Sequence, residues 1–259
     1  MIITRMLGGL GNQMFEYAMG LNLARKQKAK LKINTRAYIR SNWPYSLNNF
    51  SITATRANLL EILIIKKYYP KQYFDESYWL NTDNWTDWMG EKSFKEIESV
   101  IREEFTLNKV FRKEFENKNH SVIEQINESN SVSIHIRRTD YLEKQNLCIV
   151  LKPEYYTEAI NIITQKVKNP RYFFFSDDIE WVKSNFTHQE NSVFLSNKDY
   201  EDLTLMSLCK HNITANSTFS WWGAWLNKNP DKIVITPSKW FINNQNMEKS
   251  LIPKTWIKI

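Results

Sequence analysis

The segment Ser133-Ile-His-Ile-Arg-Arg-Thr-Asp-Tyr141 predicts a buried strand that ends in a cluster of charged side chains. Apolar residues alternate over positions 132–136, which is typical of a strand in a sheet. Arg137, Arg138 and Asp140 follow at the carboxyl end, where a parallel sheet usually opens into a ligand crevice. Arginine binds phosphate through two parallel hydrogen bonds. The pair therefore indicates an anion site, and a structural ion pair between one arginine and Asp140 is the alternative.

Strand-like and helix-like stretches alternate around this segment, which predicts an α/β fold. The N-terminal part has a strand (1–6), a glycine-rich turn, a helix (14–27) and a second strand (29–33), the order of a βαβ unit. Further helices are expected over 56–69, 96–105, 107–117, 121–128, 153–167, 179–186, 199–210 and 218–227, and further strands over 171–175, 193–195, 212–215 and 232–235. Because short strands that alternate with helices form parallel sheets, we expect two Rossmann-like domains, residues 1–120 and 121–259.

The composition of the 259-residue chain excludes several classes of protein. Its net charge is +7, from 35 basic and 28 acidic residues, which favours anionic partners. The lysines are scattered and form no basic block interleaved with aromatics, so we expect no nucleic-acid partner. Cys148 and Cys209 have neither disulfide-framework nor zinc-ligand spacing.

Two features of the sequence concern membranes and targeting. The apolar run 59–65 is too short to cross a bilayer and is followed by two lysines. Glycines at 8, 9 and 11 interrupt the apolar start, unlike a signal peptide. We expect a cytoplasmic protein whose membrane contact, at the inner face, is peripheral and weak.

The segment Gly8-Gly-Leu-Gly-Asn-Gln13 predicts a turn in which backbone N–H groups can approach a ligand at a helix start. It is not the dinucleotide fingerprint, because GxGxxG from Gly9 would need a glycine where Met14 stands, and no GK[ST] of a P-loop follows. A tight strand-to-helix turn is the structural alternative for the glycines. Asn12 and Gln13 add amides that could hydrogen-bond a ligand.

Asp177 and Asp178 follow the strand expected at 171–175 and allow three interpretations. An acidic pair can bind a divalent cation. A carboxylate can also accept two hydrogen bonds from guanine. The structural alternative is a cap and a first-turn acid for the helix that starts at Ile179.

The segment 215–227, ANSTFSWWGAWLN, places small hydroxyl residues between a strand and a helix. Ser217 or Thr218 can cap that helix, and the N–H groups of its first turn can bind a phosphate. We expect packing rather than ligand contact from Trp221, Trp222 and Trp225. Three strand ends thus carry arginine, aspartate and serine or threonine, which together predict a nucleotide diphosphate site.

Four motifs carry a family resemblance: GGLGNQMFEYA (8–18), HIRRTDY (135–141), FSDD (175–178) and ANSTFSWWGAWLN (215–227). Together they resemble the α-1,2-fucosyltransferases of glycosyltransferase family 11, in the family's order and over nearly the whole chain. The HxRRxD core is shared with α-1,6- and protein O-fucosyltransferases, whereas the first and last motifs narrow the choice to the α-1,2 group. The resemblance implies a GT-B fold, two facing Rossmann-like domains with parallel sheets, without a metal or other cofactor.

The resemblance also implies roles for single residues. Arg137 would contact the donor diphosphate, and His135 with one aspartate would contact guanine. The phosphates would also meet the start of the helix at 218, and Asn12 would lie near the reacting centre. The expected donor contacts are Gly9, Gly11, Asn12, His135, Arg137, Asp177, Asp178, Asn216, Ser217, Thr218 and Phe219, with Arg138 as structural support.

The implied reaction is the inverting transfer of L-fucose from GDP-β-L-fucose to the 2-hydroxyl of a terminal galactose, on an oligosaccharide or a lipid-linked glycan. Its transition state resembles an oxocarbenium ion. The general base is expected at Asp140 or Glu143, in addition to Arg137 and Asn12 as catalytic residues. A related α-1,6 enzyme has a glutamate where this chain has Gln145. Asp140 would otherwise pair with Arg138, and a phosphate oxygen would then accept the proton.

Two alternatives stay open on the sequence alone. A non-catalytic GDP-sugar-binding protein would keep the same nucleotide contacts and transfer nothing. The segment Lys71–Gly90, with Trp79, Trp85 and Trp88, is expected to form a wall of the acceptor site, and core packing explains these tryptophans equally well.

Overall fold

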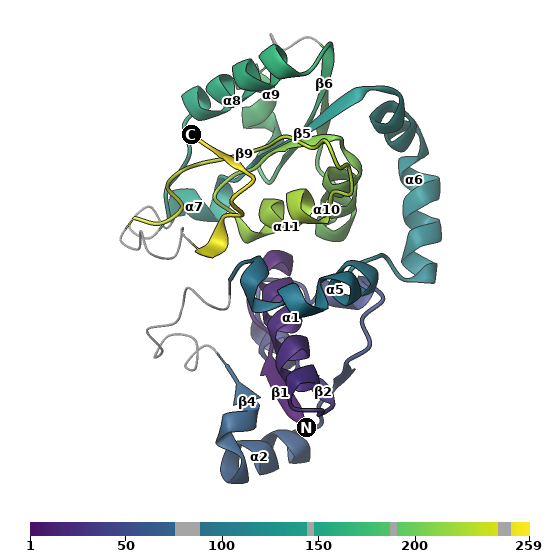
Figure 1. Ribbon diagram of the computed structural model, residues 1–259, viewed down its shortest axis with the longest axis vertical. Helices are drawn as coiled ribbons and strands as arrows, with labels where there is room; N and C mark the ends of the chain where they lie inside the picture. Colours follow the sequence, from purple (N-terminus) through teal and green to yellow (C-terminus); the bar gives the residue numbers. More distant parts are fainter. Residues whose placement is uncertain (76–88, 144–147, 187–190, 243–249) are drawn as a thin grey trace. The chain divides into compact units, whose positions relative to one another are not determined.

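The chain forms two α/β units in the computed structural model, which describes residues 1–75, 89–143, 148–186, 191–242 and 250–259 (Figure 1). One unit comprises Met1–Phe111 and Lys249–Pro253, and the other comprises Arg112–Glu248 and Lys254–Ile259. The sequence placed the division at 120/121. The chain passes from one unit to the other inside helix α6 (Lys109–Glu128), which is one helix where two were expected, because its sequence contains no glycine or proline to interrupt it.

The first unit contains a four-stranded parallel sheet in the order β3-β2-β1-β4. Its strands are β1 (Ile2–Arg5), β2 (Leu31–Asn34), β3 (Thr55–Arg56) and β4 (Tyr73–Phe74). Its helices are α1 (Leu10–Lys26), α2 (Leu59–Tyr68) and α5 (Glu98–Glu104), with 3₁₀ turns η1 (Arg36–Arg40), η2 (Leu47–Asn49), η3 (Pro70–Gln72), η4 (Glu91–Ser93) and η5 (Lys95–Ile97). The two-residue strands β3 and β4 are too short to produce a periodic pattern in the sequence.

Helix α1 packs closely against β1 because it carries a glycine at the point of contact. A Cβ atom on Gly20 would lie 2.2 Å from Oγ1 of Thr4, so only glycine fits without a shift. Helix α2 begins with a capping box, in which the Asn58 side chain accepts from the Glu61 N–H and the Glu61 side chain accepts from the Asn58 N–H. The Gly20 contact therefore sets how closely α1 lies on the sheet, and the ion pair of Glu61 with Lys32 of β2 links the start of α2 to the same sheet.

The second unit contains a six-stranded parallel sheet in the order β10-β9-β8-β5-β6-β7. Its strands are β5 (Asn130–Ile136), β6 (Pro170–Ser176), β7 (Ser192–Leu195), β8 (His211–Ile213), β9 (Val234–Thr236) and β10 (Ile257–Lys258). Its other helices are α7 (Thr139–Glu143), α8 (Pro153–Lys166), α9 (Ile179–Phe186), α10 (Asp199–Leu208) and α11 (Thr218–Leu226). Read from β7, this is the Rossmann strand order 3-2-1-4-5-6, and the first sheet has the first four strands of the same order.

Helices cover both faces of the second sheet. The apolar residues of α8 and α9, such as Tyr156 and Val182, share a core with Ile134 and Phe174 of the strands. Helices α10 and α11 lie on the opposite face (Figure 1). The expected packing role of Trp221, Trp222 and Trp225 is confirmed, since all three are buried and pack against one another in α11.

The strand order reverses between β5 and β8 in the second sheet and between β1 and β4 in the first. At such a point the connections leave in opposite directions, which opens a crevice at the carboxyl ends of the strands. In the second unit the loops after β5 and β8 lie at this reversal of the strand order. In the first unit the segment after β4 includes residues 76–88, so Trp79, Trp85 and Trp88 of the expected acceptor wall lie outside the described residues.

Candidate functional site

The candidate site lies at the carboxyl edge of the second sheet, where three strand ends meet. Strand β5 pairs with β6 on one side and β8 on the other, so the loops that follow them are neighbours. They carry Arg137, Asp177 and Ser217, the groups that the sequence placed at three strand ends. The hydroxyl of Tyr141 donates to the carbonyl of Asn216 at 2.8 Å and ties the first of these loops to the third.

Arg137 is held by two carboxylates. Its Nη2 lies 2.7 Å from Oδ1 of Asp140, and its Nη1 lies 3.2 Å from Oδ2 of Asp177. The guanidinium carbon is 5.9 Å from the centroid of the Tyr141 ring. With 17% of its side chain exposed, Arg137 is mostly buried and still reaches the surface. Arginine is the residue type that binds phosphate through two hydrogen bonds, and the expected contact of Arg137 with the donor diphosphate stays a prediction.

Arg138 has a structural position. Its Nε donates to Oδ2 of Asp178 at 3.1 Å, and its guanidinium lies over the ring of Trp181, 3.6 Å from the centroid. The expectation that Asp140 pairs with Arg138 is wrong, because Asp140 pairs with Arg137. The two arginines pair with acids from different elements. Asp140 lies three residues after Arg137, in the first turn of α7, whereas Arg138 pairs with Asp178, just before α9.

The aspartates hold the loop after β5. Asp177 accepts the backbone N–H of Arg138 at 3.0 Å and that of Thr139 at 3.3 Å, and it accepts the Thr139 hydroxyl at 2.6 Å. Oδ1 of Asp178 accepts the N–H of Trp181 at 3.3 Å, which is the expected capping of α9. Both carboxylates therefore hold protein groups in this structure.

His135 is buried beneath the site and has an unsatisfied ring nitrogen. The residue is 3% exposed, and its Nδ1 has no hydrogen-bond partner among the described residues. Burial and, secondly, the positive charge of Arg137 lower the pKa of His135 to about 3, so the ring is neutral at physiological pH. Its ring centroid lies 5.2 Å from that of Phe219. A buried polar atom without a partner costs about 1–3 kcal/mol and often marks a functional position.

The start of α11 forms the third part of the site. Ser217 is the N-cap residue, as one of the two expected alternatives, and its hydroxyl accepts the N–H of Phe219 at 3.3 Å. Thr218 and Phe219 are partly exposed, whereas Asn216 is buried. The Asn216 amide donates to the carbonyls of Ile149 and Trp240, at 3.0 and 3.1 Å, and so fixes the loop that leads into the helix.

Two tyrosines support the site and were not identified from the sequence. The hydroxyl of Tyr155, on α8, donates to the carbonyl of Thr214 at 2.7 Å, close to the point where Tyr141 reaches Asn216. Burial raises the pKa of both hydroxyls, so both remain protonated donors. Tyr141 stood inside the quoted motif, but nothing in a sequence indicates which carbonyl a tyrosine will reach.

The glycine turn of the first unit is shorter than expected, because α1 begins at Leu10 and not at 14. Gly11 and Asn12 therefore belong to the first helical turn, and Gly9 is the N-cap residue. Gly8 has a φ of 66°, the left-handed region that favours glycine. The Gln13 amide, expected to face a ligand, is buried and donates to the carbonyls of Gly8 (3.1 Å) and Pro44 (2.9 Å).

The carbonyl oxygen of Gln13 is equally engaged, since it accepts the N–H groups of Ser46 at 3.0 Å and Leu47 at 3.2 Å. An amide side chain has two donors and two acceptor positions. All four are used here by backbone groups, so Gln13 is a structural residue. Asn12 is partly exposed on the same turn, and its expected place near a ligand stays a prediction.

The two candidate bases differ in environment. Asp140 is partly buried and paired with Arg137, whereas Glu143 is exposed at the end of α7. Gln145 lies outside the described residues.

No group of three or more histidine, cysteine, aspartate or glutamate side chains arranged to hold a metal occurs in the part of the chain that the structure describes. Within that part, no helix is both long and apolar enough to span a membrane.

Solved structures resemble this chain in fold. POFUT1 in complex with GDP matches with a TM-score of 0.54 at 13% identity, over 91% of this chain and 97% of that one. Arabidopsis thaliana FUT1, as the R284K mutant in complex with GDP, matches with a TM-score of 0.50 at 11% identity, over 90% and 69%. The two Rossmann-type units are those of the expected GT-B fold.

Sequence comparisons identify the family. An Escherichia coli α-1,2-colitosyltransferase is 31% identical, over 100% of this chain and 98% of its own length. The E. coli O-antigen biosynthesis glycosyltransferase WbnK is 31% identical over 97% and 98%. The mouse galactoside 2-α-L-fucosyltransferase Sec1 is 25% identical over 87% and 64%. The model of glycosyl transferase family 11 matches residues 1–259, and the chain belongs to this family.

Proposed function

We propose that the protein is an inverting α-1,2-fucosyltransferase, which transfers L-fucose from GDP-β-L-fucose to the 2-hydroxyl of a terminal galactose. The observation that supports this most directly is the meeting of Arg137, His135 and the capped start of α11 at the strand-order reversal of the second sheet. The names of the relatives supply the α-1,2 linkage and the class of sugar.

The donor diphosphate would lie between Arg137 and the start of α11. As the bond from C1 of fucose to the diphosphate breaks, the leaving GDP gains negative charge. Arg137 is already held by Asp140 and Asp177, so it does not have to reorganise when that charge develops. The N-terminus of a helix is a second source of positive potential for the same group. Both interactions strengthen in the transition state and therefore raise the rate.

Guanine would be recognised through His135. A neutral histidine offers one donor and one acceptor, and Nδ1 of this buried ring is unsatisfied in the described part of the chain. A contact from guanine to Asp177 or Asp178 would share a carboxylate that already holds protein groups. His135 therefore carries this part of the proposal more directly than the aspartates do.

The chemical step is a displacement at C1 of fucose. The acceptor oxygen forms the new bond, the bond to the diphosphate oxygen breaks, and GDP leaves with the electron pair. The acceptor proton goes to Asp140, to Glu143 or to a phosphate oxygen. We also propose that no metal takes part, because the Arg137 guanidinium and the start of α11 both direct hydrogen-bond donors and positive potential at the diphosphate.

GDP-colitose is the second candidate donor, because a relative that matches over 98% of its own length is named an α-1,2-colitosyltransferase. Colitose is fucose without the 3-hydroxyl, so both donors present the same diphosphate and the same reacting carbon. The two would differ only where the protein meets that hydroxyl.

The decisive experiment offers GDP-fucose and GDP-colitose in parallel to a panel of β-galactosides, with and without EDTA. Released GDP is measured, and the linkage of the product is determined by NMR. We expect α-1,2-linked product and the same rate with EDTA. A loss of activity in EDTA would overturn the metal-free proposal alone. If the protein binds GDP but releases no GDP from either donor with any acceptor, it is the non-catalytic GDP-sugar-binding alternative.

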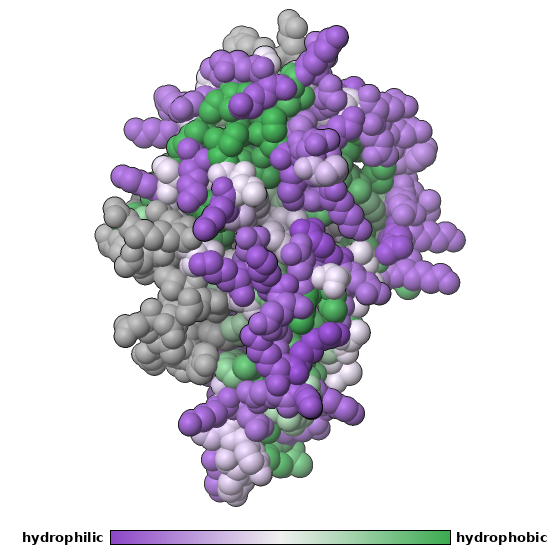
Figure 2. Space-filling view, viewed as in Figure 1, coloured by the Kyte–Doolittle hydropathy of each residue, from purple (hydrophilic) through white to green (hydrophobic). Residues whose placement is uncertain are grey.

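A peripheral membrane contact at the cytoplasmic face is proposed on the surface of α2, since a lipid-linked acceptor would require it. This helix exposes Leu60 (66%), Leu63 (56%) and Tyr68 (63%), and Lys66 and Lys67 lie in its last turn. An apolar face flanked by lysine and tyrosine suits the interface of an anionic bilayer. Figure 2 shows pale and hydrophobic surface at the lower end, over α2.

Sedimentation with vesicles tests this contact. We expect the wild type to sediment with phosphatidylglycerol vesicles, and Leu60→Ser/Leu63→Ser to remain in the supernatant with its activity on a soluble galactoside retained. If a second copy covers this face instead, the wild type will show a concentration-dependent dimer in light scattering and will not sediment.

A further inference from the structure

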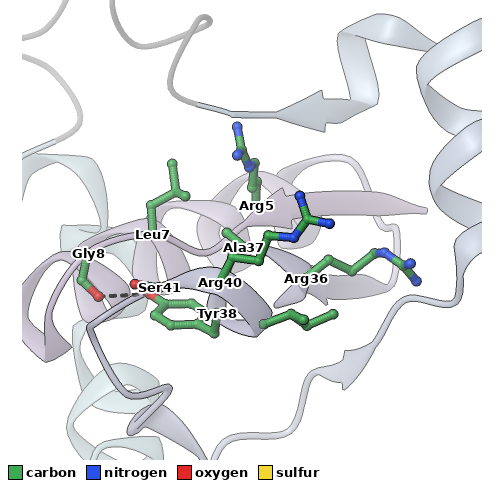
Figure 3. Close-up of a pocket in the computed structure, with 9 residues that line it drawn as sticks. Arg5, Leu7, Gly8, Arg36, Ala37, Tyr38, Arg40 and Ser41 are labelled. Carbon is green, nitrogen blue, oxygen red and sulfur yellow. Dashed lines mark hydrogen bonds between the residues drawn. The ribbon is translucent and has the colours of Figure 1, made fainter.

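A pocket of about 690 Å³ opens at the carboxyl edge of the first sheet, and arginines line it (Figure 3). Arg5 is the last residue of β1, whereas Arg36 and Arg40 stand at the two ends of η1, just after β2. Because β1 and β2 are parallel neighbours, their carboxyl ends bring the three arginines to one edge. The volume is typical of small-molecule sites and can hold a sugar with a charged substituent.

The floor of this pocket is fixed by hydrogen bonds. The hydroxyl of Tyr38 donates to the carbonyl of Gly8 at 2.9 Å, which joins η1 to the glycine turn. The N–H of Arg36 donates to Oδ1 of Asn34 at 3.1 Å, and the Asn34 amide donates to the Tyr73 hydroxyl at 2.8 Å. Two of the arginines therefore project from a backbone that is anchored to the sheet.

The lining is positively charged, and none of the residues that form it is acidic. Arg36 and Arg40 form no ion pair with any residue that the structure describes. Glu16 lies near the floor, but it is 5% exposed and its carboxylate accepts the Leu7 N–H at 2.9 Å. Like charges that converge on a hollow create a potential that attracts an anion, and arginine binds carboxylate and phosphate with matching geometry.

We infer that this pocket binds a negatively charged group of the acceptor, a carboxylate or a phosphate, and that the natural acceptor is an anionic glycan. The inference rests on the proposed function, in which the donor diphosphate is bound in the other unit by Arg137 and the start of α11. A second anion site is then available to the second substrate. Gly8 lines the pocket and also belongs to the turn that leads to Asn12. The pocket therefore lies close in the chain to a predicted catalytic residue.

The test compares three acceptors that end in the same galactose: a neutral galactoside, one linked to a uronic acid, and one carried on a short-chain lipid diphosphate. The variant is Arg36→Ala/Arg40→Ala, and the matched control is Arg25→Ala/Lys30→Ala, which removes two exposed charges of the same unit outside the pocket. We expect KM for the charged acceptor to rise about tenfold or more in the pocket variant, from the loss of charge-assisted bonds. KM for the neutral galactoside and for the control variant should change less than about threefold.

The acceptor that shows the selective loss identifies the source of the charge, a neighbouring acidic sugar or the lipid diphosphate. An equal loss on neutral and charged acceptors, or no loss on any, would overturn the inference and leave the transfer reaction intact.

A binding measurement keeps the inference testable without turnover. Glucuronic acid and inorganic diphosphate are titrated by calorimetry with GDP present at saturation, to occupy the proposed donor site. At least one of these probes should bind the wild type and bind the pocket variant about tenfold more weakly. Failure of both to bind would refute the pocket, whereas absence of GDP release with every acceptor would refute the proposed function.

Discussion

The guanidinium of Arg138 lies 3.6 Å from the centre of the Trp181 ring, so the second arginine of the motif packs into its own unit. Its neighbour Arg137 is held in place by Asp140 and Asp177 at the edge of the crevice. Two residues of the same type, adjacent in the chain, thus have different tasks. Substitutions at the two positions should separate these tasks.

Arg137→Ala is expected to lower kcat/KM at least about a hundredfold. The variant loses a fixed donor to the charge that develops on the leaving diphosphate, and one such donor is worth about 2.7–4 kcal/mol of barrier. The measurement is GDP release under kcat/KM conditions, with the thermal unfolding midpoint followed in parallel. Activity within threefold of the wild type would contradict the assignment of Arg137.

Arg138→Ala is expected to act on stability first. The side chain is 14% exposed and gives up both its contact with Trp181 and its ion pair with Asp178. Such a cation–π contact contributes about 0.5–2 kcal/mol. Urea denaturation should show a free energy of unfolding lower by about 1–2 kcal/mol, with saturable GDP binding still present at low temperature. A variant of unchanged stability that cannot bind GDP would place Arg138 in the donor site instead.

The pH dependence of stability should contain a contribution from His135. Its pKa is lowered from 6.5 to about 3 in the folded protein, chiefly by burial. Between these values the unfolded chain binds a proton that the folded chain does not, so the free energy of unfolding falls as the pH is lowered from 6.5 toward 3. His135→Phe should make this part of the profile shallower by up to one proton. An unchanged slope would show that His135 does not titrate in this way.

Glycine substitutions should distinguish packing from ligand approach. In Gly20→Ala the new Cβ would meet Oγ1 of Thr4 at 2.2 Å, and overpacking of this kind costs about 1–3 kcal/mol, against a gain of about 0.5–1 kcal/mol in helix propensity. We expect a net loss of stability. In Gly9→Ala the nearest atom, in the Trp43 ring, is 3.5 Å away, which is ordinary contact.

Gly9→Ala should therefore fold normally, and it isolates the predicted donor contact at this position. If the backbone of Gly9 approaches the donor, kcat/KM falls by far more than the small loss of stability expected from alanine at an N-cap position. Full activity of this variant would remove Gly9 from the predicted donor-binding residues.

The sequence predicted best those helices and strands whose ends are marked by local capping residues and apolar periodicity. Helix α9 has the expected bounds 179–186, because an acidic cap and an apolar period mark both of its ends. Helix α1 starts at Leu10, earlier than the expected residue 14, because Gly9 serves as its N-cap residue. Strand β10, with two residues, was missed since it is defined by its pairing with β9 and not by its own pattern.

The residue types of the candidate site could be predicted from the sequence, but the hydrogen-bond and ion-pair partners of each residue could not. The convergence of three strand ends follows from alternation alone, because parallel strands bring their carboxyl ends to one edge. Which carboxylate faces Arg137 or Arg138 depends on side-chain directions after the strand, which no spacing in the sequence determines. The arginines of the first-unit pocket are spread over residues 5–40 and form no motif, so only the pairing of β1 with β2 reveals them.

The Gln13 side chain behaves as an inserted peptide group. It donates to the carbonyls of Gly8 and Pro44 and accepts the N–H groups of Ser46 and Leu47. The segment 44–47 is therefore joined to α1 by three hydrogen bonds of one side chain. Glutamate at this position would lose both donors while keeping the shape, and alanine would leave four backbone groups to find water. A movement of the glycine turn that keeps these four hydrogen bonds must therefore carry segment 44–47 with it.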